Sequence, residues 1–382
     1  MNILFFDMGS YTYRDASAAM ERLGHSVDTV YYHFANRYED DFFSPRFEQE
    51  LMKKKYDVVF SINFFPLVAL VCKNKNIPYV SWSYDSPLDE RLSEYFDYDT
   101  NYIFLFDRVE VQKYLTGGHD RVFHMPLAVN TDRLDALKLN RYSATQKMEI
   151  SFVGKIYEST LGDLMMPAND YVKGYVDALM QAQLGLYGCN ILEETISDDV
   201  LESLNDSYAA LGQCALRLNR RGLAYAISTQ ITHFERTFLL DELAERRDVH
   251  IYTLDRCELS AKVHKHGPVK YYSEMNEVFV NSKLNLCPTL RSIASGIPLR
   301  ALDIMGAGGN LVSNYQPELA EYFTDGESVI MYESIEDAIA KVEYYLEHDE
   351  ERIAIAVNGY EQVKKRFGYE DKISEMLGMV SL

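Results

Sequence analysis

The densest run of residues suited to chemistry lies between Asn285 and Glu321, NLCPTLRSIASGIPLRALDIMGAGGNLVSNYQPELAE. Its pattern predicts a buried strand, a loop rich in backbone N–H donors over 288–296, and a helix from Ile297 to Met305 with proline in its first turn. The start of such a helix is an anion site, because unpaired N–H groups and the positive end of the helix dipole point outward. A diphosphate is a natural ligand there.

Two charged side chains of this segment fit a nucleotide. Arg291, on the loop, offers a bidentate guanidinium to a phosphate. Asp303, about two turns into the helix, is placed to accept hydrogen bonds from vicinal hydroxyls such as those of a ribose. We expect the nucleotide-binding backbone at the helix start to be that of Ser295, Gly296 and Ile297.

The first 125 residues alternate short β-branched or aromatic runs with helical stretches, which predicts a parallel sheet with crossover helices. The predicted strands are 2–6, 27–32, 57–63, 79–84 and 102–106. Ligands bind beyond the carboxyl ends of such strands. Asp85, in a Tyr-Asp-Ser-Pro turn after the fourth strand, is our candidate for a base or an acceptor ligand, although an Asp before Ser-Pro is very often just a turn former or helix cap. Four strands run out into polar residues: Asp7-Met8-Gly9-Ser10, Asn63, Asp85-Ser86-Pro87 and Asp107.

The second half predicts another α/β domain with a helical insertion. A polar, weakly periodic stretch over 126–147 marks the boundary. We therefore expect two Rossmann-like, doubly wound domains facing across a cleft: 1–145, 146–365 with an insertion over about 158–230, and a tail, 366–382, that packs back on the first domain. The predicted strands of the second domain are 148–153, 249–253, 269–271, 284–287, 310–313 and 328–331.

Composition excludes several classes of partner. The chain has 382 residues, 38 basic against 58 acidic, and a net charge of −20, so its average field repels nucleic acid and anionic bilayers. No apolar run is long enough for a membrane helix, and the start MNILFFDMGS lacks the basic region of a signal peptide. The five cysteines form no CxxC pair, so we expect no metal site and a reducing, cytoplasmic location.

The sequence resembles the CgeB-like glycosyltransferases, which belong to the GT-B fold class and are related to glycosyltransferase family 4. The C-terminal strings GIPLRALDIMGAGGNLVSNYQPELAEYFTDGESVIMY and YYLEHDEERIAIAVNGYEQV carry most of the resemblance. The blocks ISFVGKIY, WSYDSP and FLFD match more weakly. The resemblance covers most of the chain outside the helical insertion.

The resemblance implies metal-independent transfer of a sugar from a nucleotide-diphosphate sugar, with UDP-sugars as the expected donors and with retention of anomeric configuration. In related enzymes an E-x7-E pattern places one glutamate at the donor sugar and a second at the ribose. Here the second position is Asp303 and the first is Ser295, which lacks the sugar-facing charge. Gly154 and Lys155 match the loop that meets the diphosphate, where a cation offsets leaving-group charge.

Three further interpretations complete the sequence picture. Tyr272 lies near enough to the nucleotide loop to stack on a base, and the basic run Lys262 to His266 is either a solvated loop or a nucleotide contact. The insertion is suited to recognition of a glycan, lipid-linked or protein acceptor, or to self-association as a homodimer.

Two other functions compete with sugar transfer. Ser295 in place of glutamate favours a catalytically silent nucleotide-sugar binding protein. Two Rossmann-like domains also allow an NAD(P)-dependent dehydrogenase, but no G-x-G-x-x-G fingerprint opens either domain.

Overall fold

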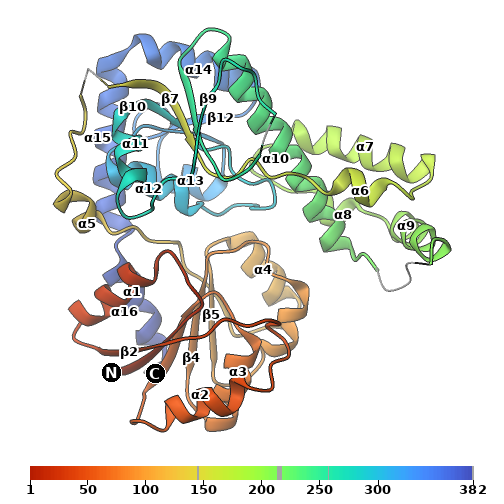
Figure 1. Ribbon diagram of the computed structural model, residues 1–382, viewed down its shortest axis with the longest axis vertical. Coiled ribbons are helices and arrows are strands. Elements are labelled where there is room, and N and C mark those ends of the chain that lie inside the picture. Colours follow the sequence, from red (N-terminus) through yellow and green to blue (C-terminus); the bar gives the residue numbers. More distant parts are fainter. Residues whose placement is uncertain (144–145, 213–216, 257, 381–382) are drawn as a thin grey trace. The chain divides into compact units, whose positions relative to one another are not determined.

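The computed structural model divides the chain into two compact units, Met1–Arg133 with Val363–Leu382, and Leu134–Gln362 (Figure 1). Each unit contains one six-stranded parallel sheet, which confirms the predicted α/β class. The structure describes residues 1–143, 146–212, 217–256 and 258–380.

The sheet of the first unit has the strand order β2-β1-β3-β4-β5-β6. Every pair is parallel, so all six carboxyl ends lie at one edge. The predicted strands are present with small shifts at their ends, and the short β6 is an addition. The strands are β1 (Asn2–Asp7), β2 (Ser26–Tyr31), β3 (Val58–Ile62), β4 (Tyr79–Ser83), β5 (Asn101–Leu105) and β6 (Val122–His124).

Alternate side chains of these strands pack under helices on opposite faces of the sheet. Leu4 and Phe6 of β1 belong to the core that also contains Phe43 and Val68 from helices. Phe5 points the other way and meets the ring of Tyr13, with 5.0 Å between centroids. Figure 1 shows α1 and α16 on one face and α2, α3 and α4 on the other. These helices are α1 (Tyr13–Arg22), α2 (Phe43–Leu51), α3 (Pro66–Lys75), α4 (Arg108–Thr116) and α16 (Tyr369–Val380), with a 3-10 turn over Glu90–Tyr95.

The C-terminal helix α16 is part of the first unit. The Tyr369 ring lies 5.8 Å from that of Trp82 on β4, and its hydroxyl is 3.2 Å from that of Tyr84. The backbone N–H of Val129 also donates to the carbonyl of Phe367, 2.9 Å away. The end of the chain is therefore held by buried aromatic contacts.

The observed division falls earlier than the predicted boundary after residue 145, which itself lies outside the described residues. Residues beyond helix α5 (Thr131–Ala136) already belong to the second unit. The reason is a packed linker: Arg141 Nε donates to the carbonyl of Ala307 at 2.8 Å and Nη1 pairs with Asp135 at 2.6 Å. Polar composition alone does not reveal that a linker is packed.

The sheet of the second unit has the order β12-β11-β10-β7-β8-β9. From β7 the chain adds β8 and then β9 on one side of the sheet. It then returns to the other side of β7, where it adds β10, β11 and β12. The strand order therefore reverses between β7 and β10. A predicted strand at Val269–Tyr271 was wrong, because the edge strand β9 is formed instead by three exposed residues of the basic run. The strands are β7 (Met148–Val153), β8 (Val249–Tyr252), β9 (His264–His266), β10 (Ser282–Leu286), β11 (Leu311–Asn314) and β12 (Ile330–Tyr332).

One long helix, α10 (Arg220–Ala244), connects the helical insertion to this sheet (Figure 1). Its first half buries Leu223 and Ile227 in the core of the insertion. Its second half buries Leu239 and Leu243 against the sheet. The insertion contains α6 (Leu161–Met165), α7 (Asp170–Leu184), α8 (Leu192–Thr195) and α9 (Asp198–Ala210); the sheet is accompanied by α11 (Glu274–Asn281), α12 (Leu299–Ala307), α13 (Pro317–Tyr322), α14 (Ile335–Glu347) and α15 (Asp349–Arg366).

The structure also bears on the predicted absence of membrane helices and on the cysteines. Among the described residues, no helix has both the length and the apolar character needed to cross a bilayer. Cys72, Cys189 and Cys287 are free thiols. Cys214 and Cys257 lie outside the described residues.

Replacing Tyr369 by alanine should destabilise the first unit by about 3 kcal/mol or more, because truncating a large buried ring leaves a cavity beside Trp82. Trp82 is the sole tryptophan of the sequence and is fully buried, so urea denaturation followed by its fluorescence reports on this unit. Tyr171→Ala, which removes an exposed tyrosine of the second unit, is the control. An unchanged midpoint for Tyr369→Ala would contradict the packing described.

Candidate functional site

The loops that follow β7 and β10 meet where the strand order of the second sheet reverses. Gly154 and Lys155 follow β7, and the segment Pro288 to Pro298 follows β10. In open α/β sheets, ligands bind outside the carboxyl ends of the strands at this switch point. The topology therefore brings together the two loops in which the sequence predicted phosphate contacts.

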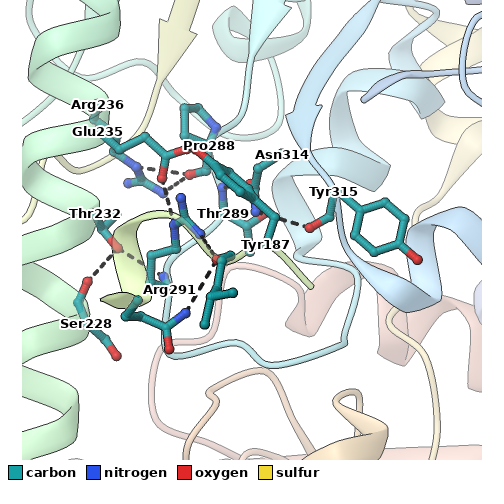
Figure 2. Close-up of polar contacts among 12 residues, drawn as sticks. Tyr187, Ser228, Thr232, Glu235, Arg236, Pro288, Thr289, Arg291, Asn314 and Tyr315 are labelled. Atoms are coloured by element: carbon teal, nitrogen blue, oxygen red, sulfur yellow. Dashed lines mark hydrogen bonds and ion pairs between the residues drawn. The ribbon is translucent and has the colours of Figure 1, made fainter. Parts of the chain in front are cut away.

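A buried guanidinium joins the two loops (Figure 2). Arg236 of α10 donates from Nη1 to the carbonyl of Lys155 at 2.5 Å. It also donates from Nε to the carbonyl of Pro288 at 3.0 Å, and from Nη2 to the same oxygen. Burial lowers the pKa of Arg236 from its ordinary value. One side chain from the helix thus fixes the backbone of both loops.

Glu235, the residue before Arg236 on α10, forms a buried pair with Arg291 of the loop after β10 (Figure 2). Arg291 Nε donates to Glu235 Oε2 at 2.8 Å, and the side chains are only 4% and 0% exposed. Arg291 Nη1 donates to the carbonyl of Leu186 at 2.7 Å. The backbone N–H of Arg291 donates to Thr232 Oγ1 at 2.9 Å. Arg291 therefore anchors its loop to α10 rather than extending from it into solvent.

Two tyrosines complete the surroundings of Glu235. Tyr187 and Tyr332 donate their hydroxyls to Glu235 Oε1 at 3.2 and 3.0 Å. Burial and the neighbouring Glu235 carboxylate raise the pKa of both phenols well above the ordinary range, so both stay protonated and donate. The Tyr187 ring also lies 3.9 Å from the guanidinium carbon of Arg291. The carboxylate is thus compensated by one cation and two hydroxyl donors.

One donor of this network has no partner among the described residues. Arg291 Nη2 is buried and donates no hydrogen bond there, although Nε and Nη1 both donate. A phosphate role for Arg291 is therefore limited to this one nitrogen, and remains a prediction.

Helix α12 begins at Leu299, two residues after the predicted start at Ile297. Pro298 has the extended ψ of 148° that is typical of an N-cap, so the helix starts after it. Gly296 and Ile297 are buried in the preceding loop. The predicted glycine stop is correct: Gly308 follows the helix with a left-handed φ of 86°.

Asp303 lies on the buried side of α12, 2% exposed. Its Oδ1 accepts a hydrogen bond from the Tyr271 hydroxyl at 2.9 Å, and Oδ2 lies 3.3 Å from Arg300 Nη1. Tyr272, which the sequence predicted to stack on a base, is half-buried and packs edge to face on Tyr271 at 5.1 Å. The carboxylate is therefore oriented by its neighbours, and a tyrosine pair lies directly beside it.

Ser295 is hydrogen-bonded to a buried carboxylate, that of Glu318, which the sequence pattern did not single out. Ser295 Oγ donates to Glu318 Oε1 at 2.8 Å, and the Glu318 N–H donates to the Ser295 carbonyl at 3.1 Å. The exposed fractions are 3% for Ser295 and 1% for Glu318. Glu318 belongs to α13, far enough along the chain that no fixed spacing could pair it with Ser295.

In the first unit, the polar residues after β3, β4 and β5 come together in pairs. Asn63 donates from Nδ2 to Asp85 Oδ2 at 2.9 Å and accepts from the N–H of Tyr84 at 2.7 Å. Ser86 Oγ donates to Asp107 Oδ2 at 3.1 Å. The exposed Asp85 is thus oriented by Asn63 at the carboxyl ends of β3 and β4.

Replacing Arg291 by methionine should destabilise the second unit by about 3–5 kcal/mol, because the Glu235 carboxylate is left buried without its cation. The double variant Arg291→Met with Glu235→Leu removes both charges and should recover much of that loss. The measurement is thermal denaturation of each variant. A double variant less stable than Arg291→Met would overturn this account of the pair.

Comparisons with known proteins indicate a glycosyltransferase. Residues 236–378 match the model of the glycosyl transferase-like family. No curated protein sequence matches the chain.

Solved structures share the architecture of the whole chain. A glycosyltransferase from Rickettsia africae is 12% identical with a TM-score of 0.57, covering 99% of this chain and 97% of its own. Sucrose-phosphate synthase from Thermosynechococcus elongatus is 11% identical with a TM-score of 0.58, covering 99% and 98%. Anabaena HepE, solved with UDP and glucose, is 11% identical with a TM-score of 0.54, covering 99% and 100%. The chain has the GT-B fold and carries a glycosyl transferase-like domain in it.

Proposed function

We propose that the protein is a glycosyltransferase that moves a sugar from a UDP-sugar to a hydroxyl of a glycan, lipid-linked or protein acceptor. Within the GT-B class, we propose kinship with the CgeB-like enzymes related to family 4. The match of residues 236–378 to a glycosyl transferase-like family and the UDP bound to HepE support this proposal. A cytoplasmic location and a homodimer remain predictions.

The observation that carries the proposal is the placement of Asp303. Its carboxylate is buried, oriented by Tyr271 and Arg300, and located on the helix that follows the switch-point loop. A carboxylate held in this way accepts two hydrogen bonds from the vicinal hydroxyls of a ribose. Beside it, Tyr271 and Tyr272 offer aromatic faces for a base.

We assign the diphosphate to the start of α12 and to the loop of Gly154 and Lys155. The N-terminus of α12 has no side-chain cap, so its helix dipole and N–H groups favour an anion, and the exposed Lys155 supplies a cation. These groups offset the charge that develops on the departing nucleotide, so the proposed transfer needs no metal. We further propose retention of configuration, with Asp85 orienting the acceptor.

The second candidate, a catalytically silent binder, was motivated by Ser295 at the sugar-facing position. Glu318 favours catalysis over that alternative. Ser295 donates its proton to Glu318, and we propose that this charged partner strengthens a hydrogen bond between the Ser295 hydroxyl and the donor sugar. Charge-assisted chains strengthen such a bond. We propose that the pair together replaces the missing glutamate.

Replacing Asp303 by asparagine should weaken UDP binding by about tenfold to a hundredfold, since a hydrogen bond to a charged group contributes about 1.5–3 kcal/mol. The measurement is titration calorimetry with UDP, with ADP, GDP and NAD as comparison ligands. Glu327→Gln, a neutralised exposed glutamate of the same unit, is the control. Binding of NAD without binding of any nucleoside diphosphate would refute the proposed function.

Replacing Glu318 by glutamine should lower the rate of UDP release from a UDP-sugar by about tenfold to a hundredfold, because the Ser295 hydroxyl loses its charged partner. Affinity for UDP itself should stay within about twofold, since UDP carries no donor sugar. Ser295→Ala should show the same pattern, and Glu327→Gln should not. Equal loss of UDP affinity and of rate would place Glu318 in the fold rather than at the sugar.

A further inference from the structure

The strand β8 and the residue before it present polar side chains on one face. Side chains alternate along a strand, so Asp248, His250 and Tyr252 point to one side while Val249 and Ile251 are buried in the sheet core. His250 Nε2 lies 3.0 and 3.1 Å from the two carboxylate oxygens of Asp248.

The edge strand β9 adds two more imidazoles to that face. The strands are parallel and in a register that pairs His250 with His264 and Tyr252 with His266. The ring centroids of His250 and His264 are 4.7 Å apart, and those of His250 and His266 are 5.1 Å apart. The spacing D-x-H on one strand and H-x-H on its neighbour thus gathers one carboxylate and three imidazoles.

Three of these groups have the spacing of a metal site. Three possible ligand atoms lie within 4.8 Å of one another, one each from Asp248, His250 and His264. His264 Nε2 is 3.3 Å from Asp248 Oδ1. Two ligands about 2.0–2.1 Å from a tetrahedral Zn²⁺ are themselves about 3.3 Å apart, so both contacts with the carboxylate already fit. The side chains of Asp248 and His264 are 38% and 59% exposed, so an ion reaches them from water.

His266 orients the central ligand. His250 Nδ1 lies 2.8 Å from His266 Nε2, and the His266 ring stacks on Tyr252 at 4.5 Å. A metal-binding histidine almost always donates its other ring N–H to an acceptor, which fixes its tautomer. With Nδ1–H donated to His266, the lone pair of His250 Nε2 points toward Asp248.

We propose that Asp248, His250 and His264 bind a divalent transition-metal ion of the Zn²⁺ class at the β8–β9 edge of the second sheet. Imidazole nitrogens select such ions over Mg²⁺ and Ca²⁺, which prefer oxygen ligands. Three protein ligands leave a coordination position for water or an external group. The ion joins the edge strand β9 to β8. Its ligands take no part in the proposed donor contacts, so the site is independent of sugar transfer.

The competing interpretation is an ordinary ion-pair cluster, in which Asp248 shares its charge between two imidazoles without an ion. His119 with Asp97 in the first unit is a matched example of such a pair, with Nδ1 2.9 Å from Oδ1. The two interpretations differ in stoichiometry and in ion selectivity, and both are measurable.

The test is calorimetric titration of the full-length protein, purified without a polyhistidine tag and stripped by a chelator, with ZnCl₂ and separately with MgCl₂. We expect one equivalent of Zn²⁺ to bind and no binding of Mg²⁺. His264→Ala should weaken Zn²⁺ binding by more than about a hundredfold, and His266→Ala by about 10–100-fold, the range for loss of an orienting partner. His119→Ala should bind Zn²⁺ as the unaltered protein does.

A second readout separates a lost site from a damaged fold. The metal-free variants should melt within about 2 °C of the metal-free parent, since His264 is an exposed edge residue, and only the parent and His119→Ala should melt higher with Zn²⁺. Co²⁺ in the same site should give the visible absorption of a tetrahedral N/O environment. Zn²⁺ binding that is absent, or that is equal in the parent and His264→Ala, would overturn the proposal.

Discussion

The buried guanidinium of Arg236 is the interaction on which the candidate site depends. It bonds to the carbonyls of Lys155 and Pro288, which belong to loops after two different strands. Removing a guanidinium from water is costly unless its donors are used. Arg236 meets that requirement only when both loops are in place, so their mutual geometry is fixed by one side chain of α10.

Glu235, the adjacent residue on α10, extends the same constraint. It binds Arg291 and accepts from Tyr187 and Tyr332, which come from the insertion side and from β12. A buried ion pair is weak evidence for stability, but it requires one arrangement of its partners. The long helix therefore sets the position of the loop before α12, and with it the approach to Asp303.

Most strands of the fold were predictable because buried parallel strands have sequences that are short runs of β-branched or aromatic residues. The strand Met148–Val153 was predicted to the residue. The edge strand was missed for the same physical reason: His264–His266 is exposed, so its sequence carries no apolar signal. The start of α12 was misplaced by two residues because proline fits both the first turn and the N-cap.

The sequence by itself determined the α/β class, the glycine loop before a helix, and the candidate role of Asp303, since each depends on local spacing. The candidate roles of Gly154 and Lys155 came from the resemblance to the glycosyltransferase family. A signal for Glu235 and Arg236 was also present, as two charges on the buried stripe of an amphipathic helix. Only the tertiary structure decided that Arg291 is enclosed by Glu235, that Ser295 meets Glu318, and that His250 lies beside His264. These pairs join distant segments, and burial and strand register, which no single segment encodes, bring them together.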